Sequence, residues 1–228
     1  MMDMARPSKY GVVGGLGAVA GVDTLLKMIK ATPQRQFDVA FEQHPFADSG
    51  LACSEDYDPT RRKFYVYNML KTMERSGVDV ALVPCFVSHC FLAELAPELD
   101  LSVVSLVDAL QACVTKNYPQ VRSIGVLTST FVKDAQLFDR AFGDTWNVLY
   151  PEPEVQAQGL MSAVYGPRGI RNGHHDGWCL DSLVSACENL IEQGAELILP
   201  GLTEIPVFID ALRMRVGVPI IDSCLLYT

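Results

Sequence analysis

The 228-residue sequence predicts an α/β protein with two pseudo-symmetric lobes, each a parallel sheet flanked by helices, and an active-site cleft between the lobes. One observation behind this prediction is that short apolar runs alternate with longer segments of helical spacing, as in parallel sheets with helices on both faces. The other is an internal repeat. Residues 77–85 align with 194–202 at an offset of 117, and residues 11–13 align with 125–127 at an offset of 114.

The two offsets are close, which indicates a duplication and hence two similar lobes. We expect residues 1–108 and 213–228 in the first lobe and residues 109–212 in the second. Ligands of parallel α/β folds bind beyond the carboxyl ends of the strands, and in a duplicated protein both ends can face one cleft. The residues that follow the two aligned strands are Cys85 and Leu202, so these positions are the first candidates for a site.

The first half of the chain contains four short apolar runs and three segments of helical spacing. In the helix expected at 18–31, the larger apolar residues fall on one side, and in the helix at 60–76 Phe64, Tyr67, Met69, Leu70 and Met73 form the expected core face. Residues 45–59 carry turn residues without a period, so we expect a long loop there. The strands are expected at 10–13, 37–41, 80–83 and 102–105, and the third helix passes through Leu110.

The second half repeats this alternation. Residues 165–176 are rich in glycine and polar side chains, so they are expected to form a loop. Strands are expected at 123–127, 148–150, 197–199 and 219–221, and helices at 132–142, 155–164, 180–193 and 203–214.

Composition and charge exclude several classes of protein. Hydrophobic residues make up 49% and charged residues 20%, which is ordinary globular usage and excludes a disordered or fibrous chain. The net charge of −9 disfavours binding to nucleic acid, which needs clustered positive charge. No apolar run approaches the ~18 residues of a membrane span, and residues 1–9 lack the apolar region of a signal peptide. The seven cysteines are odd in number and irregularly spaced, so we expect free thiols and a cytoplasmic protein.

Cys85 is the cysteine most favourably placed for chemistry. It follows Pro84 at the end of a strand and precedes a helix expected to start near Ser88. A helix N-terminus favours the thiolate over the thiol, and the thiolate is the reactive form. His89, four residues on, could assist the thiol or could be a core or surface histidine. The cysteines expected to serve as packing residues are Cys90, Cys113, Cys179 and Cys187.

The other motifs are weaker evidence for a functional site. Residues 15–20 follow a strand and open a helix, so they fit a loose dinucleotide fingerprint, but a tight turn that binds an anion such as a carboxylate is the preferred interpretation. His174, His175 and Asp176 are adjacent, but no second group has zinc-ligand spacing, so no metal site is expected. The sequence has no G-x-S-x-G element, which argues against a Ser-His-Asp hydrolase.

Four segments resemble, in order, the motifs of the cofactor-independent aspartate/glutamate racemase superfamily. Residues 11–17 (GVVGGLG) are similar to the opening strand and glycine turn of that family, and residues 84–89 (PCFVSH) to its Pro-Cys-Asn-Thr-Ala-His motif. Residues 165–173 (YGPRGIRNG) are similar to its Tyr-Gly-Pro-x-Gly-Ile-Lys-x-Gly loop. Residues 201–206 (GLTEIP) are similar to its Gly-Cys-Thr-Glu-Ile/Leu-Pro motif.

The resemblance implies a mechanism as well as a fold. In that family each lobe presents one cysteine to the substrate α-carbon, one thiolate removing the proton and the other thiol delivering a proton from the far side. No cofactor takes part, the substrate is a small carboxylate, and dimers are common. We therefore expect a homodimer that uses no cofactor, acts on a small-molecule carboxylate and binds neither nucleic acid nor membrane.

The sequence departs from the family pattern at several site positions. Leu202 stands where the family has its second cysteine, and Phe86 and Val87 replace the Asn and Thr of the first motif. The family's Pro-Asp-Arg-Thr segment corresponds to residues 45–48, which contain no arginine. Arg171 replaces the family lysine and keeps a positive charge. We expect Cys85 to be catalytic, and the expected substrate-binding residues are Gly15, Phe86, Val87, Ser88, Arg171, Leu202, Thr203 and Glu204.

Three functions remain open at this point. The first is a racemase-type isomerase whose two-base chemistry is impaired or altered by Leu202. The second is a one-base lyase, decarboxylase or tautomerase that acts on a more apolar carboxylate, because Phe86, Val87 and Leu202 would form an apolar wall. The third is a non-catalytic binding protein on the racemase fold. The isomerase leads because the resemblance covers nearly the whole chain, and Cys85 is then the expected proton-transferring residue.

Overall fold

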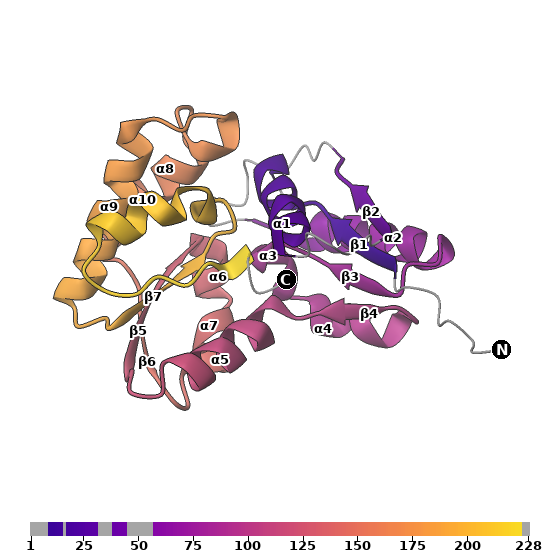
Figure 1. Ribbon diagram of the computed structural model, residues 1–228, viewed down its shortest axis with the longest axis horizontal. Helices are drawn as coiled ribbons and strands as arrows, with labels where there is room; N and C mark the ends of the chain where they lie inside the picture. Colours follow the sequence, from indigo (N-terminus) through magenta and orange to yellow (C-terminus); the bar gives the residue numbers. More distant parts are fainter. Residues whose placement is uncertain (1–8, 16, 32–37, 45–56, 225–228) are drawn as a thin grey trace.

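The chain folds into two parallel sheets with helices around them, as a computed structural model describes for residues 9–15, 17–31, 38–44 and 57–224 (Figure 1). The first sheet has the strand order β2-β1-β3-β4 and the second has the order β6-β5-β7. This arrangement confirms the predicted α/β class. The strands are β1 (Lys9–Val13), β2 (Asp38–Glu42), β3 (Val80–Leu82), β4 (Ser102–Val104), β5 (Ser123–Thr128), β6 (Asn147–Leu149) and β7 (Leu197–Gly201).

Helices flank both sheets and connect their strands (Figure 1). The α-helices are α1 (Ala18–Ala31), α2 (Thr60–Arg75), α3 (Phe86–His89), α4 (Leu92–Leu95), α5 (Leu106–Asn117), α6 (Thr130–Asp134), α7 (Leu137–Phe142), α8 (Ser162–Tyr165), α9 (Gly177–Glu192) and α10 (Ile209–Arg215). The shorter helical elements are the 3₁₀ helices η2 (Ala96–Glu98), η4 (Ile170–Asn172) and η5 (Ile205–Phe208), and the π-helix η3 (Val155–Met161).

The two sheets repeat one topology. In each, the first strand of the lobe is flanked by the second on one side and the third on the other, so that β1, β2 and β3 correspond to β5, β6 and β7. β4 is the fourth strand of the first sheet. Among the described residues, its counterpart in the second sheet is a single bridge between Ile198 and Ile220. The strand expected at 219–221 is therefore reduced to one bridge. The shared topology agrees with the duplication inferred from the sequence offsets.

The turns that lead into the third strand of each lobe also repeat. Gly77 after α2 and Gly194 after α9 both have a positive φ, 77° and 101°, which glycine adopts without strain. In each lobe, the residue two positions after this glycine has a carboxylate that accepts a hydrogen bond from the backbone N–H of the first residue of β1 or β5. The Asp79 carboxylate lies 2.7 Å from that nitrogen in β1, and the Glu196 carboxylate lies 3.0 Å from that nitrogen in β5.

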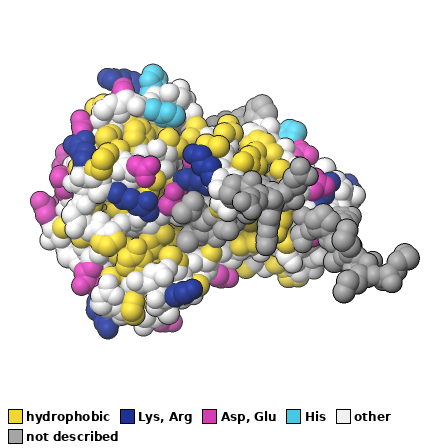
Figure 2. Space-filling model, viewed as in Figure 1, with side chains coloured by type: hydrophobic (Ala, Val, Ile, Leu, Met, Phe, Trp, Pro, Cys, Tyr) yellow, Lys and Arg dark blue, Asp and Glu magenta, His cyan; other side chains and the backbone are white. Residues whose placement is uncertain are grey.

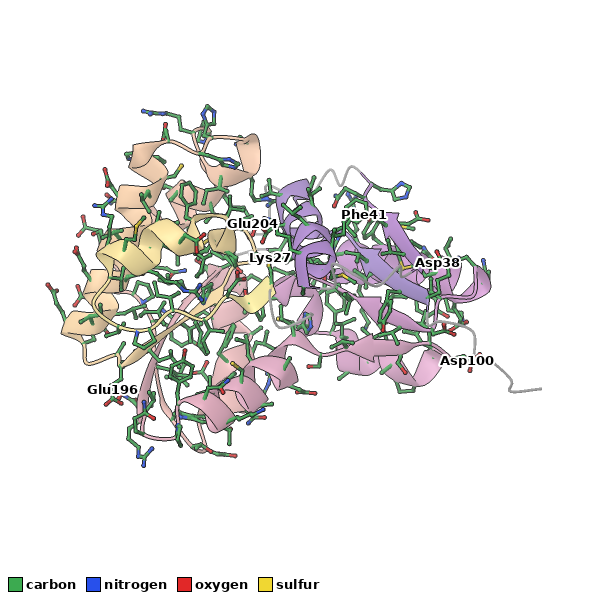
Figure 3. All side chains as sticks on the ribbon, in the orientation of Figure 1. Lys27, Asp38, Phe41, Asp100, Glu196 and Glu204 are labelled. Carbon is green, nitrogen blue, oxygen red and sulfur yellow. The ribbon has the colours of Figure 1, made fainter. Side chains whose placement is uncertain are left out.

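The strands of both sheets run from the outer ends of the molecule toward its middle. Figure 3 shows Asp38 and Asp100, at the starts of β2 and β4, at one outer end, and Glu196, before β7, at the other. Glu204, which follows β7, lies in the middle near α1. The carboxyl ends of the two sheets therefore converge, and the loops that follow them meet between the lobes.

One hydrophobic cluster runs through both lobes. It extends from Leu70 on α2 through Phe86 on α3 to Phe138 on α7 and Leu197 on β7. The rings of Phe86 and Phe138 have centroids 5.2 Å apart, so an aromatic contact joins the lobes next to Cys85.

The residues after α10 touch both lobes. Ile220 bridges to the second sheet, whereas Asp222 is 5% exposed and forms an ion pair of 2.8 Å with Lys27 on α1. The lobe boundaries at 108/109 and 212/213 stay a prediction.

The larger apolar side chains on one side of α1 are exposed rather than buried in the core. Val22, Leu26 and Ile29 are 54%, 47% and 51% exposed, and Figure 2 shows hydrophobic side chains on the face that includes α1. The buried side of α1 consists of small or slender residues, because a Cβ at Gly21 would already lie 3.1 Å from the Phe41 ring. On α2, Phe64 is likewise wrong as a core residue, since it is 64% exposed.

Three expected helices are interrupted. The helix expected at 132–142 divides into α6 and α7, because Gln136 takes a left-handed conformation with φ of 53°. The helix expected at 155–164 begins as the π-helix η3, and the one expected at 203–214 begins as the 3₁₀ helix η5, which has Pro206 in its first turn. The loop expected at 45–59 lies outside the described residues up to position 56. No described helix has the length and apolar character to span a bilayer.

We predict that Gly125→Ala destabilises the fold. A Cβ at Gly125 would lie 2.9 Å from the Ile198 Cδ1 atom and 3.0 Å from the Leu190 Cβ atom, and the latter cannot move without shifting α9. The expected loss in the free energy of unfolding is about 1–3 kcal/mol, measured by urea denaturation. Gly177→Ala is the matched control, since a Cβ there meets nothing within 4 Å. Equal stability of the two variants would contradict this account of the β5–α9 contact.

Candidate active site

A pocket lies where the two sheets converge, and both lobes line it. The empty space there is about 270 Å³, a volume that includes open solvent. The lining residues from the first lobe are Cys85, Phe86 and Val87. Those from the second lobe are Ser129, Val132, Tyr165, Gly201, Leu202, Thr203 and Glu204.

Cys85 lies at the junction between β3 and α3, and 5% of its surface is exposed. Its extended backbone, with φ of −161°, puts it at the N-cap position of a helix that starts at Phe86, two residues before the expected start. This helix is only four residues long, so few peptide dipoles add up at its end. The glycine turn packs behind the thiol, because a Cβ at Gly15 would lie 3.0 Å from the Pro84 carbonyl oxygen and 3.6 Å from the Cys85 Cβ.

His89 holds the backbone of Cys85 rather than its thiol. The Nε2 atom of His89 accepts a hydrogen bond from the Leu106 backbone N–H at 2.9 Å, so the hydrogen is on Nδ1, which donates to the Cys85 carbonyl at 2.9 Å. Burial lowers the pKa of His89 to about 4, against the opposing effect of the hydrogen bond to Cys85. The ring is therefore neutral with both nitrogens engaged, and of the roles that the sequence left open for His89, this arrangement favours the core histidine.

Arg62 is a site residue that sequence reasoning missed. Its side chain is fully buried on α2, where Nε donates to the Ser88 hydroxyl at 3.3 Å and Nη2 donates to the Gly14 carbonyl at 3.0 Å. Its guanidinium also lies 4.8 Å from the centroid of the Tyr65 ring. The helical spacing of 62, 66, 70 and 73 on the buried side of α2 is the signal that could have found it. Arg62 thus ties the first motif to the glycine turn.

Leu202 and Thr203 face Cys85 from the second lobe. Both are 4% exposed, and the Thr203 hydroxyl donates a hydrogen bond of 3.1 Å to the Pro84 carbonyl, across the lobe junction. The residue two positions after the third strand of one lobe is therefore fixed against the residue two positions after the third strand of the other.

Arg171 and Glu204 form a buried ion pair at the pocket. The Arg171 Nε lies 3.5 Å from the Glu204 Oε1, and the two side chains are 8% and 7% exposed. The Arg171 guanidinium lies 4.8 Å from the centroid of the Tyr165 ring. A Cβ at Gly17 would lie 3.0 Å from the Arg171 Nε, so the glycine turn makes room for this pair. Burial raises the pKa of Glu204, and the neighbouring Arg171 opposes that rise.

The structure brings most of the predicted site residues together. Gly15 and Arg171 do not line the pocket themselves but lie against Cys85 and Glu204, which do. The Ser88 hydroxyl accepts a hydrogen bond from Arg62. Ser129 is a pocket residue that the sequence repeat could have identified, because an offset of 114 from Gly15 leads to it. The predicted residues that line the pocket directly are Cys85, Phe86, Val87, Leu202, Thr203 and Glu204.

The described part of the chain contains no group of three or more His, Cys, Asp or Glu side chains that could hold a metal ion. His174 and His175 are both exposed, and the His175 ring packs edge-on against Phe208 with centroids 5.9 Å apart.

We predict that His89 makes the stability of the fold depend on pH. Because its folded pKa of about 4 lies below the ordinary value of 6.5, the unfolded chain binds a proton first. The stabilisation is complete above pH 6.5 and is lost as the pH falls toward 4, at about 1.4 kcal/mol per pH unit. Urea denaturation between pH 7 and 4 should show a steeper loss for the wild type than for His89→Gln. His174→Gln, at an exposed position, should keep the wild-type slope, and equal slopes for all three proteins would refute the prediction.

Comparisons with known proteins agree with this architecture. An aspartate racemase homologue from Pyrococcus horikoshii superposes with a TM-score of 0.74 at 18% identity, covering 96% of this chain and 95% of that one. The aspartate racemase of Picrophilus torridus gives a TM-score of 0.75 at 16% identity, with 95% and 89% covered. A glutamate racemase isoform from Bacillus anthracis gives 0.71 at 16% identity, with 96% and 77% covered.

At these identities, the structural similarities show a shared fold. The family assignment comes from the sequence: the family model described as Asp/Glu/Hydantoin racemase matches residues 12–227, nearly the whole chain. The chain belongs to the Asp/Glu/hydantoin racemase family.

Proposed function

We propose that this protein is a cofactor-independent isomerase that moves a proton at the α-carbon of a small carboxylic acid through Cys85. The observation that carries the proposal is the location of Cys85: it lines a pocket between two lobes of racemase fold and is the one thiol among the described residues that line it. A thiol is a usable base near neutral pH because the ordinary pKa of cysteine is about 8.5.

The surrounding residues supply what α-proton removal needs. As the Cys85 thiolate takes the proton, negative charge develops on the substrate carboxyl group and requires hydrogen-bond donors. Ser129 is suited to this role, because its Oγ accepts the Val132 N–H at 3.3 Å and its own hydrogen remains to be donated. The Arg171 guanidinium, behind Glu204, adds positive charge on the same side of the pocket.

A one-base lyase, decarboxylase or tautomerase is the second candidate, and the apolar wall favours it. Val87, Val132 and Leu202 line the pocket, so it can accept an apolar substituent on the substrate. A non-catalytic binding protein remains the third possibility. The homodimer also stays a prediction, supported by the exposed apolar side of α1.

Hydrogen exchange in D₂O separates these functions. Both enantiomers of aspartate, glutamate and a 5-substituted hydantoin, together with apolar α-substituted acids, are incubated with the protein, and loss of the α-hydrogen and optical rotation are followed. Exchange with inversion supports the isomerase, and exchange with retention supports a one-base site. Absence of exchange from every compound would contradict the proposal.

We predict that Cys85→Ala and Cys85→Ser both abolish inversion, and the exchange of α-hydrogen from the enantiomer whose proton Cys85 removes, while the fold is kept. Alanine has no ionisable group, and the serine hydroxyl is a far weaker acid than a thiol, so a loss of at least 100-fold is expected. Cys90→Ala is the matched control, because Cys90 is not one of the residues that line the pocket and burial raises the pKa of its thiol to about 12. Activity of both Cys85 variants at the wild-type level would remove Cys85 from the mechanism.

We predict that Leu202→Cys raises the rate of racemisation relative to α-hydrogen exchange. The substitution places a thiol on the pocket wall contributed by the lobe opposite Cys85. Leu202→Val is the control, since it also shortens the side chain but adds no acid or base. Enantiomer ratios measured by chiral chromatography give the result. If Leu202→Cys behaves like Leu202→Val, loss of a thiol at position 202 is not what limits inversion.

A further inference from the structure

We infer that Glu204 is the second proton-transfer group of this site and acts from the lobe opposite Cys85. The inference rests on the proposed function, because it completes a proton transfer that Cys85 begins. It assigns to a carboxyl group the role for which position 202 offers only a leucine.

The pocket lining leaves few candidates for a second acid or base. Among the described lining residues, the side chains with an ionisable group are Cys85, Tyr165 and Glu204. The Tyr165 ring is covered by the Arg171 guanidinium at 4.8 Å. The Thr203 hydroxyl already donates to the Pro84 carbonyl at 3.1 Å. The Glu204 carboxyl group is therefore the best-placed acid in the half of the pocket contributed by the second lobe.

The surroundings of Glu204 support both of its protonation states. Its side chain is 7% exposed, and this burial favours the neutral acid. Arg171, from η4, lies 3.5 Å from Oε1 and stabilises the carboxylate once the proton has left. The other groups on this side are the backbone of Gly17 and the ring of Tyr165 from α8, and Cys85 is the ionisable group contributed by the first lobe. A buried carboxyl group beside one cation is suited to cycling between acid and base.

The proton balance of the reaction is complete with these two groups. The Cys85 thiolate removes the α-hydrogen as a proton and becomes the thiol, and the electron pair of the C–H bond passes into the enolate of the substrate. The neutral Glu204 carboxyl group then gives its proton to the α-carbon from the other side and becomes a carboxylate beside Arg171. In the reverse direction, the Glu204 carboxylate removes the proton and the Cys85 thiol delivers one. Exchange of protons with water returns the pair to its starting state.

The position of an isotope in early product tests the inference. Each enantiomer of aspartate, glutamate and the 5-substituted hydantoin is incubated in D₂O with wild type, Glu204→Gln, Glu204→Asp and the control Glu192→Gln, whose side chain is exposed on α9. With two groups, the wild type should place deuterium in the inverted product while the remaining substrate keeps hydrogen. Glu204→Gln should lose at least 100-fold in inversion but keep Cys85-dependent exchange in one enantiomer. Glu204→Asp should recover part of the inversion, and Glu192→Gln should match the wild type.

Other outcomes separate this inference from the proposed function. If Glu204→Gln inverts at the wild-type rate, or only its KM rises, Glu204 is not the acid, whereas Cys85 chemistry still stands. If the wild type exchanges with retention alone, the site has one base and the inference fails, again without affecting Cys85. When both proposals hold, Glu204→Gln keeps exchange in one enantiomer, Cys85→Ser keeps exchange only in the other, and neither variant inverts the substrate.

If none of these compounds is a substrate, a measurement on the protein alone tests the inference. Protein labelled with ¹³C at the glutamate carboxyl carbons is titrated by NMR, and the resonance absent from Glu204→Gln is assigned to Glu204. The inference requires this carboxyl group to titrate above the ordinary range of glutamate and its midpoint to move in Cys85→Ala. A Glu204 that stays ionised down to pH 4 overturns the inference, whatever happens to Cys85.

Discussion

The structure depends on one constraint: the carboxyl ends of two parallel sheets meet, and the residues that follow β3 and β7 are held against each other. The Thr203 hydroxyl, hydrogen-bonded to the Pro84 carbonyl at 3.1 Å, fixes this contact within a buried environment. The ring contact between Phe86 and Phe138 supports it from the core side. Because the contact joins the lobes at the residue before Cys85, the position of the thiol follows from the way the lobes pack.

Buried charges surround this contact, and each connects segments that are distant in sequence. Arg62 joins α2 to the first motif and the glycine turn, Arg171 and Glu204 join the two motif loops of the second lobe, and Lys27 joins α1 to Asp222. Removing one partner of a buried pair leaves an uncompensated charge, which costs roughly 3–5 kcal/mol. The two ion pairs therefore constrain the segments that they connect.

The sequence was sufficient for the fold class and the pairing of the motifs, because alternation of elements and the repeat are local signals. The position of Cys85 at the end of β3 followed from the same pattern. The faces of α1 and α2 did not, since close approach to the Phe41 ring of β2 requires Gly21 on one helix, and a buried Arg62 occupies a core position on the other. The roles of His89 and Arg62 depend on hydrogen bonds to backbone groups far along the chain, which residue spacing does not encode.

Divergence between the two halves explains the chemistry of the site better than either half alone. The repeat pairs Cys85 with Leu202 and Gly15 with Ser129, so the first lobe contributes a thiol and a glycine turn, and the second contributes an apolar wall, a hydroxyl and a carboxyl group. A site with two thiols would treat both faces of an α-carbon alike. In the proposed reaction a thiol faces a carboxyl group, so the proton affinities on the two sides differ and the two proton-transfer steps have different barriers. Because the enantiomers have equal free energies, kcat/KM is the same in both directions, so the proposed pair would show its asymmetry only in kcat and KM taken separately, with Arg171 acting on the Glu204 side.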